Sequence, residues 1–78
     1  MARYYFDIAD GPDSGTDEVG LEFPTLKAAR DNALATLGEI ARDELPDGDS
    51  RDFEISIRDE RGKVLLTATL ALRVNQWM

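Results

Sequence analysis

The sequence predicts an α+β fold in the chain order ββαββ, a two-layer sandwich with one amphipathic helix packed on a three- to four-stranded, mainly antiparallel sheet. Apolar residues recur at helical spacing over 25–45, and they alternate with polar residues over 3–9 and 51–58. A longer alternating segment follows at 63–74. Because 78 residues suffice for one domain and are too few for two, residues 1–78 are expected to form a single domain.

The first strand is expected at residues 3–9, where alternation of apolar and polar side chains indicates one buried face. Residues 10–15 are rich in glycine, proline and aspartate, which favour turns, and are therefore expected to form a loop. Alternation resumes at 19–23 and ends at Pro24, which lacks a backbone N–H for sheet pairing. A short second strand is expected there.

The helix is expected over residues 25–45. Thr25 stands one position before the apolar pattern begins, where its hydroxyl can cap the helix by accepting a hydrogen bond from a backbone N–H. The run Pro46-Asp47-Gly48 is expected to stop the helix, because proline cannot supply the N–H that a further turn requires. At about 100° per residue, one arc of the helix contains Leu26, Ala29, Ala33, Leu34, Leu37, Ile40, Ala41 and Leu45.

Two residues interrupt or border this apolar stripe. Arg30 lies inside it, and two interpretations are open: its aliphatic stem covers apolar surface while the charge reaches water, or it forms a salt bridge with an acid of the sheet or of the 10–22 segment. Gly38 lies at the edge of the stripe and is expected to let another element approach closely, at a cost to the helix of up to ~1 kcal/mol.

The last two strands are expected at 51–58 and 63–74. Because opposed residues of an antiparallel pair share a face, the connecting loop must bring the two apolar sets together. A two-residue loop satisfies this condition but demands a positive φ at Arg61, whereas a four-residue loop over Asp59–Gly62 places Gly62 in the position that often requires one. The four-residue loop is therefore expected, and it pairs Ile57 with Val64, Ile55 with Leu66 and Phe53 with Ala68.

This register leaves the end of the 63–74 strand extending beyond its partner. Another strand is then needed along its far half, and the 3–9 strand is the expected neighbour.

Composition excludes several classes of function. A net charge of −7 opposes binding to the phosphate backbone of nucleic acids, which depends on clustered Lys and Arg. The chain has no His and no Cys, so the commonest general base, the thiol nucleophile and the usual zinc ligands are missing. We therefore expect no enzymatic activity, no catalytic residues, no cofactor and no bound metal. With no apolar run long enough to span a bilayer, a cytoplasmic location without membrane binding is expected.

Two surfaces are candidates for binding. The outer side of the last strand is free of charge, and a tryptophan follows it; aromatic residues are enriched in interface cores, although Trp77 can also fold back on its own domain. This favours a non-enzymatic protein-interaction module that is homodimeric or binds another protein. The alternative is a small-ligand or divalent-cation site in the acidic 10–22 segment. The candidate interaction surface comprises Leu65, Thr67, Thr69, Ala71 and Trp77.

Five short motifs follow one another along the chain: Arg3-Tyr4-Tyr5-Phe6-Asp7, Asp10-Gly11, Gly20-Leu21-Glu22-Phe23-Pro24, Ala28-Ala29-Arg30 and Arg58-Asp59-Glu60-Arg61-Gly62. In this order and spacing they resemble a family of small uncharacterised bacterial proteins catalogued as a domain of unknown function. The resemblance implies a stand-alone bacterial cytosolic protein and transfers no catalytic residue.

Over Gly20 to Leu37, a strand ends at a proline before an Ala-rich helix. This segment has a weaker similarity to the antitoxin partners of toxin–antitoxin pairs, which suggests an antitoxin-like partner protein.

Overall fold

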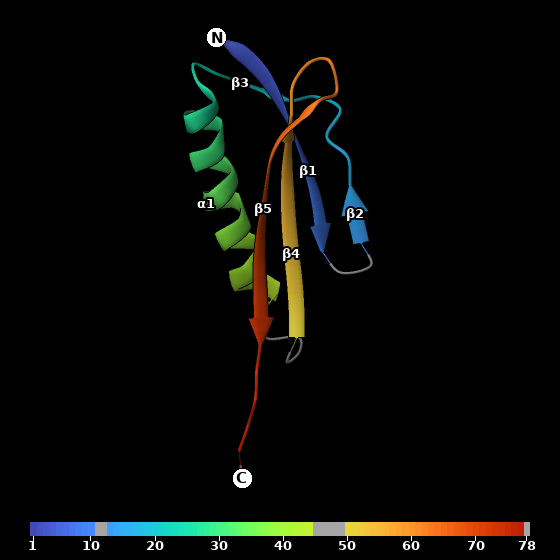
Figure 1. Cartoon of the computed structure of the whole chain (residues 1–78), viewed down its shortest axis with the longest axis vertical. Coiled ribbons are helices and arrows are strands. Elements are labelled where there is room, and N and C mark those ends of the chain that lie inside the picture. Colours follow the sequence, from blue (N-terminus) through green and yellow to red (C-terminus); the bar gives the residue numbers. More distant parts are fainter. Residues whose placement is uncertain (11–12, 45–49, 78) are drawn as a thin grey trace.

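The structure is a computed structural model that describes residues 1–10, 13–44 and 50–77. One helix packs on a five-stranded, mainly antiparallel sheet, which confirms the predicted α+β architecture (Figure 1). No helix in the described part of the chain is both long and apolar enough to cross a membrane. The elements are β1 (Ala2–Asp10), β2 (Asp13–Gly15), β3 (Leu21–Phe23), α1 (Leu26–Glu44), β4 (Ser50–Arg58) and β5 (Val64–Arg73).

The sheet has one strand more than the sequence indicates. Residues 13–15, expected to lie in a loop, form β2 and pair with the end of β1, with Ile8 opposite Gly15. These residues carry no alternating pattern, so their extended conformation comes from pairing with a neighbouring strand rather than from their own side chains. The loop prediction is therefore wrong for this half of the 10–15 segment.

The short strand expected at 19–23 begins two residues later, at Leu21, because Gly20 has φ = +74° and cannot continue a strand. Gly20 is buried, and a Cβ atom placed on it would lie 2.9 Å from Arg3 Cγ and 3.0 Å from the Tyr4 carbonyl oxygen. Glycine is thus required here by both backbone conformation and close approach.

The strand order is β2-β1-β4-β5, whereas the sequence predicted that β1 would lie beside β5. β1 pairs with β4, with Phe6 opposite Ile57 and Ile8 opposite Ile55, and not with β5. The physical reason is the register between β4 and β5. These strands are matched along their whole length, up to Ser50 opposite Arg73, so β5 leaves no overhang that a further strand must cover.

The β4–β5 register lies two residues away from the predicted one: Ile57 faces Leu66, not Val64. The connection spans residues 59–63, and a register shift lies where Arg58 pairs with Val64. A shift of two residues keeps every side chain on its predicted face, so the two apolar sets still meet although the connection has five residues rather than the predicted four. By the same shift, Ile55 faces Ala68 rather than Leu66, and Phe53 faces Leu70 rather than Ala68.

The core lies between α1 and the sheet. Thr25 caps the helix as predicted, since its hydroxyl oxygen accepts a hydrogen bond from Ala28 N at 3.1 Å. The buried stripe is narrower than predicted, because Leu26 and Leu34 remain exposed, and it consists mainly of alanine, which lets the helix lie close to the strands. Leu45 and the expected stop at 46–48 lie outside the described residues. The buried core comprises Tyr4, Ala29, Ala33, Leu37, Ala41, Phe53, Ile55 and Ile57.

Arg30 and Gly38, the two residues that interrupt or border the apolar stripe, do not make the contacts with other described elements that the sequence suggested. The Arg30 side chain is half-exposed and pairs with Asp31, its neighbour on α1, rather than with an acid of the sheet or of the 10–22 segment. No atom of the described residues lies within 4 Å of a Cβ atom built on Gly38, so none of the described elements approaches the helix there. The expectation of close approach at Gly38 is wrong.

Candidate functional site at the β5 edge

β5 stands at one end of the strand order and pairs only with β4 among the described strands. Roughly half of the backbone N–H and C=O groups of such a strand point away from its neighbour, so an edge strand offers a template for a further strand. Figure 1 shows β5 running along the sheet beside α1, with its outer edge uncovered by another strand. A ten-residue free edge is long, since strands usually measure about five or six residues.

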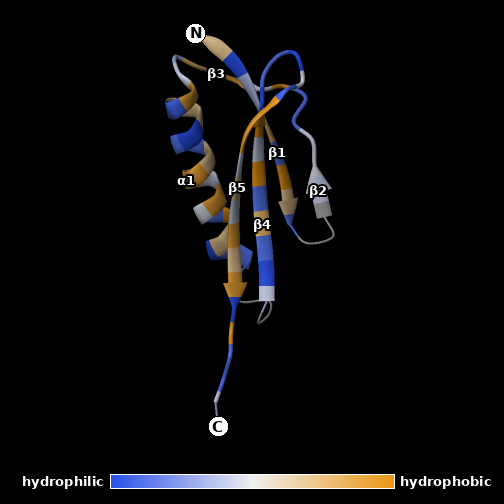
Figure 2. Cartoon of the chain, in the orientation of Figure 1, coloured by the Kyte–Doolittle hydropathy of each residue, from blue (hydrophilic) through white to orange (hydrophobic). Residues whose placement is uncertain are grey.

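The composition of β5 sets it apart from β4. Hydrophilic and hydrophobic residues alternate along β4 in Figure 2, whereas no charged residue occurs in β5 before Arg73. Proteins commonly protect edge strands with charges, prolines or bulges. Here such protection is confined to the two ends: the register shift near Leu65 lies at one end and Arg73 at the other. The regular and uncharged part of the edge is therefore Leu66–Leu72.

Apolar surface accompanies this edge. The exposed fractions are 54% for Val64, 37% for Leu65 and 39% for Leu70, while Ala71 is also exposed. Thr67 and Thr69 are exposed on the outer face, where the Thr67 hydroxyl lies 3.1 Å from that of Ser56 and forms a hydrogen bond with it. The four β5 residues of the predicted interaction surface thus lie along one strand.

Trp77, the fifth residue of that predicted surface, lies apart from the other four. Residues 74–77 lead away from the body of the domain beyond the end of β5 (Figure 1), and Trp77 is 88% exposed. Trp77 therefore does not fold back on its own domain. An exposed tryptophan on an extended segment next to a free edge is unusual for a surface without a partner.

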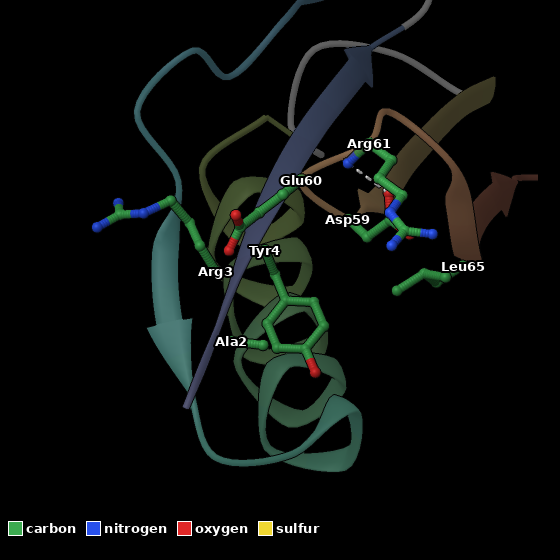
Figure 3. Close-up of a pocket in the computed structure, with 7 residues that line it drawn as sticks. All are labelled: Ala2, Arg3, Tyr4, Asp59, Glu60, Arg61 and Leu65. Atoms are coloured by element: carbon green, nitrogen blue, oxygen red, sulfur yellow. Dashed lines mark hydrogen bonds between the residues drawn. The ribbon is translucent and has the colours of Figure 1, made fainter.

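A pocket of about 330 Å³ adjoins the opposite end of β5. It lies where the start of β1 meets the β4–β5 turn, and Figure 3 shows the Tyr4 ring across its middle with Arg61 and Leu65 on one side. The Tyr4 ring belongs to the core and is only 9% exposed, so this wall is rigid. The lining residues are Ala2, Arg3, Tyr4, Asp59, Glu60, Arg61 and Leu65.

The turn beside the pocket is held by Asp59. One oxygen of its carboxylate accepts hydrogen bonds from the backbone N–H groups of Arg61 and Lys63, both at 2.9 Å. Gly62 has φ = +85°, the left-handed conformation predicted for it, and its N–H donates to the Asp59 carbonyl oxygen at 3.0 Å. The Arg61 side chain is exposed, and its backbone is fixed by these bonds. The turn therefore fixes the backbone position from which the Arg61 side chain extends at the pocket rim.

One carboxylate of the acidic 10–22 segment, that of Asp17, binds the chain's own backbone. The Asp17 carboxylate accepts hydrogen bonds from Phe6 N at 3.1 Å, Val19 N at 3.0 Å and Gly20 N at 3.1 Å. Burial raises the pKa of Asp17, but the backbone donors at Gly20, Val19 and Phe6 outweigh it and hold that pKa below its ordinary value. The Asp17 carboxylate therefore serves as a hydrogen-bond acceptor for the chain's own backbone.

Asp10 and Asp7, which flank this segment, form ion pairs with β4. Asp10 pairs with Arg51, and the Arg51 guanidinium also lies 5.2 Å from the centre of the Phe53 ring. Asp7 pairs with Arg58 on the opposite face of the sheet. Within residues 1–10, 13–44 and 50–77, no group of three or more acidic side chains is placed to hold a metal ion.

The sequence singled out four residues of β5 as a candidate surface but did not reveal two structural features beside them, the free edge and the pocket. The free edge was missed because the predicted register left part of β5 for β1 to cover. The pocket was missed because it combines Ala2, Arg3 and Tyr4 with a turn more than 50 positions later, and the alternation pattern says nothing about how far β1 extends beyond the end of β4.

A family model described as a domain of unknown function (DUF6894) matches residues 3–71. The match spans all six elements except the ends of the first and last strands, and it includes the β5 stretch Leu66 to Ala71. Trp77 lies outside it. No curated protein and no solved structure matches the chain.

Proposed function

The chain belongs to the DUF6894 family, whose description assigns no activity, and we propose from the geometry of the β5 edge that it is a non-enzymatic protein-interaction module. Its binding surface is the free edge of β5, and its partner is a second copy of the chain. Two β5 strands pair antiparallel about a two-fold axis and join the two sheets into one.

The observation that carries this proposal is the long, uncharged, regular edge at Leu66–Leu72. Backbone pairing of two edges satisfies N–H and C=O groups on both, as in other recognition by strand addition. The chain as a whole has a charge of −7, which makes two copies repel each other, but none of that negative charge lies on β5. Two copies can therefore approach through β5 without bringing like charges together.

Symmetry favours a second copy over an unrelated strand. The stretch Leu66–Leu72 is centred on Thr69, and its helix-side residues are apolar on both sides of this centre. Pairing about Thr69 sets the partner's Leu72 opposite Leu66 and keeps both helices on the same side of the joined sheet. The partially exposed Leu70 then gains apolar contact with the partner's Ala68.

The size of the domain supports the same conclusion. A core of about 70–80 residues seldom supplies more than ~3–5 kcal/mol of stability without disulfides, metal or association. The chain has no Cys for a disulfide and neither Cys nor His for a structural zinc site. Association through β5 would supply the third.

Thr69→Lys tests the proposal, because it places two like charges opposite each other at the two-fold axis. Sedimentation equilibrium of the native chain should show a dimer, and Thr69→Lys should shift it toward monomer by roughly tenfold or more in dissociation constant. Ala35→Lys is the matched control: it adds the same charge at an exposed position of α1 and should leave the dimer intact.

A mixture of Thr69→Lys with Thr69→Glu sharpens the test. If position 69 faces itself across the axis, the mixture should associate more tightly than either variant alone. A native chain that stays monomeric at millimolar concentration contradicts the proposal. So does a dimer that Thr69→Lys does not weaken, because its interface then lies elsewhere.

A further inference from the structure

Each copy has an exposed tryptophan beyond one end of β5 and an unfilled pocket at the other end. The distance between them within one chain is large, because ten strand residues at about 3.4 Å each separate the two ends by roughly 34 Å. A chain therefore cannot fill its own pocket with its own Trp77 while β5 stays paired with β4.

Antiparallel pairing removes this separation. In the proposed pair the two β5 strands run in opposite directions, so residues 74–77 of one copy lie near the start of β5 in the other copy. Trp77 lies as far beyond Thr69 in the sequence as Arg61 lies before it. Pairing about Thr69 thus brings the partner's Trp77 level with Arg61, which lines the pocket.

We infer that the pocket between the start of β1 and the β4–β5 turn is the receptor site for Trp77 of a second copy. The inference rests on the proposed function, and it assigns to that function a specific binding site and ligand. Each dimer contains two such sites, one at each end of the joined β5 strands.

The chemistry of the pocket suits an indole ring. Tyr4 and Leu65 provide apolar walls, and Arg61 provides a cation that can lie over the ring face, for which tryptophan is the best aromatic partner. The Arg3 guanidinium is held elsewhere, by the Val19 carbonyl oxygen and Glu22, so Arg3 contributes only the stem of its side chain. A volume of about 330 Å³ falls within the range of natural ligand pockets of about 300–1,000 Å³. Burial of a tryptophan removes about 150–250 Å² of surface from water, most of which is now exposed.

The chain has a single tryptophan, so its fluorescence reports on Trp77 alone. Emission and acrylamide quenching are to be measured over a dilution series, with sedimentation equilibrium on the same samples. We expect the emission to shift to shorter wavelength and quenching to fall as the dimer forms. Trp77→Ala should weaken dimerisation by roughly 30-fold, as expected for an interface hot spot.

Arg61→Ala and Lys63→Ala form a matched pair of variants in one turn. Arg61 lines the pocket and Lys63 does not. Arg61→Ala should therefore weaken the dimer and return part of the emission toward that of exposed tryptophan, whereas Lys63→Ala should change neither.

The outcomes separate the two proposals. A dimer in which Trp77 remains fully quenchable, or in which Arg61→Ala and Lys63→Ala behave alike, overturns the assignment of the pocket and leaves the β5 edge as the interface. A chain that remains monomeric at every concentration overturns both.

Discussion

Arg58 on β4 donates hydrogen bonds through two guanidinium nitrogens to the carboxylate of Asp7 on β1, and its Nη2 also donates to the Asp17 carbonyl oxygen at 2.9 Å. Asp7 in turn accepts a hydrogen bond from Asp17 N at 3.0 Å. This cluster connects three segments on the face of the sheet opposite α1. Its ion pair is largely shielded, with exposed fractions of 23% and 27% for the two side chains.

Asp7→Asn should destabilise the domain by about 1–2 kcal/mol, because it replaces charge-assisted hydrogen bonds with weaker neutral ones. The free energy of unfolding is to be measured by urea denaturation. Asp52→Asn is the control, since the Asp52–Arg73 pair is more than half exposed and such pairs contribute little. Equal effects of the two substitutions would show that the Asp7 cluster is no stronger than an ordinary surface pair.

The same cluster predicts the response to acid. The hydrogen bond from Arg58 holds the pKa of Asp7 below its ordinary value. The pKa of Asp17 is likewise lowered, since the backbone donors outweigh the effect of burial. Carboxylates with a depressed folded-state pKa stabilise the fold above their unfolded pKa of about 3.9, and this stabilisation is lost as the pH falls through the folded value.

Unfolding free energy should therefore hold steady from neutral pH to about pH 5 and decline below about pH 4. Urea denaturation across this range measures it. In Asp7→Asn the decline should be shallower, because one of the two groups no longer titrates. An identical slope in the variant would assign the acid sensitivity to other carboxylates.

Gly20→Ala should destabilise the domain, because the new Cβ meets Arg3 Cγ at 2.9 Å and Tyr5 Cε2 at 3.0 Å and the residue has a positive φ. We expect a cost of about 2–4 kcal/mol, from the left-handed conformation together with the contact. Gly62→Ala is the comparison, since Gly62 shares the positive φ but has open space around it. It should cost only about 1–2 kcal/mol in urea denaturation. Equal costs would mean that the neighbours of Gly20 yield without penalty.

Gly38→Ala should stabilise the domain by up to about 1 kcal/mol, since alanine restricts the unfolded chain more and no atom in the described part of the chain lies within 4 Å of the added methyl group. Thermal and urea unfolding both measure this. The reverse change at the exposed Ala35 of the same helix, Ala35→Gly, should destabilise by a similar amount. A destabilising Gly38→Ala would indicate that Gly38 is needed for contact with another chain.

Periodicity was enough to predict the helix, its Thr25 cap and the faces of the strands, because these depend on neighbouring residues and on burial. The pairing of strands was harder. Parity cannot distinguish Ile57 opposite Val64 from Ile57 opposite Leu66, since both keep the apolar faces together. The correct choice depends on the five-residue turn and the register shift at Arg58, which depend on the Asp59 hydrogen bonds.

For the candidate site, the sequence likewise indicated which residues share a face but not which strands are neighbours. The absence of charge on Leu65, Thr67, Thr69 and Ala71 identified β5 as a surface from sequence alone. That β5 is an edge depends on the long-range choice of β1 to pair with β4. For the acidic segment, composition counts carboxylates without revealing that Asp17 binds backbone donors and Asp10 binds Arg51.

The two ends of the strand order are unequal, and this limits the size of any assembly built by adding strands. β5 offers ten residues, whereas β2 at the other end has three. A sheet with two long open ends can polymerise, each copy binding one neighbour on either side. In the proposed symmetric pair, the long ends of both copies are occupied and only the short ends face outward. Such an assembly would stop at two copies, and the exposed β5 edge would not lead to fibres.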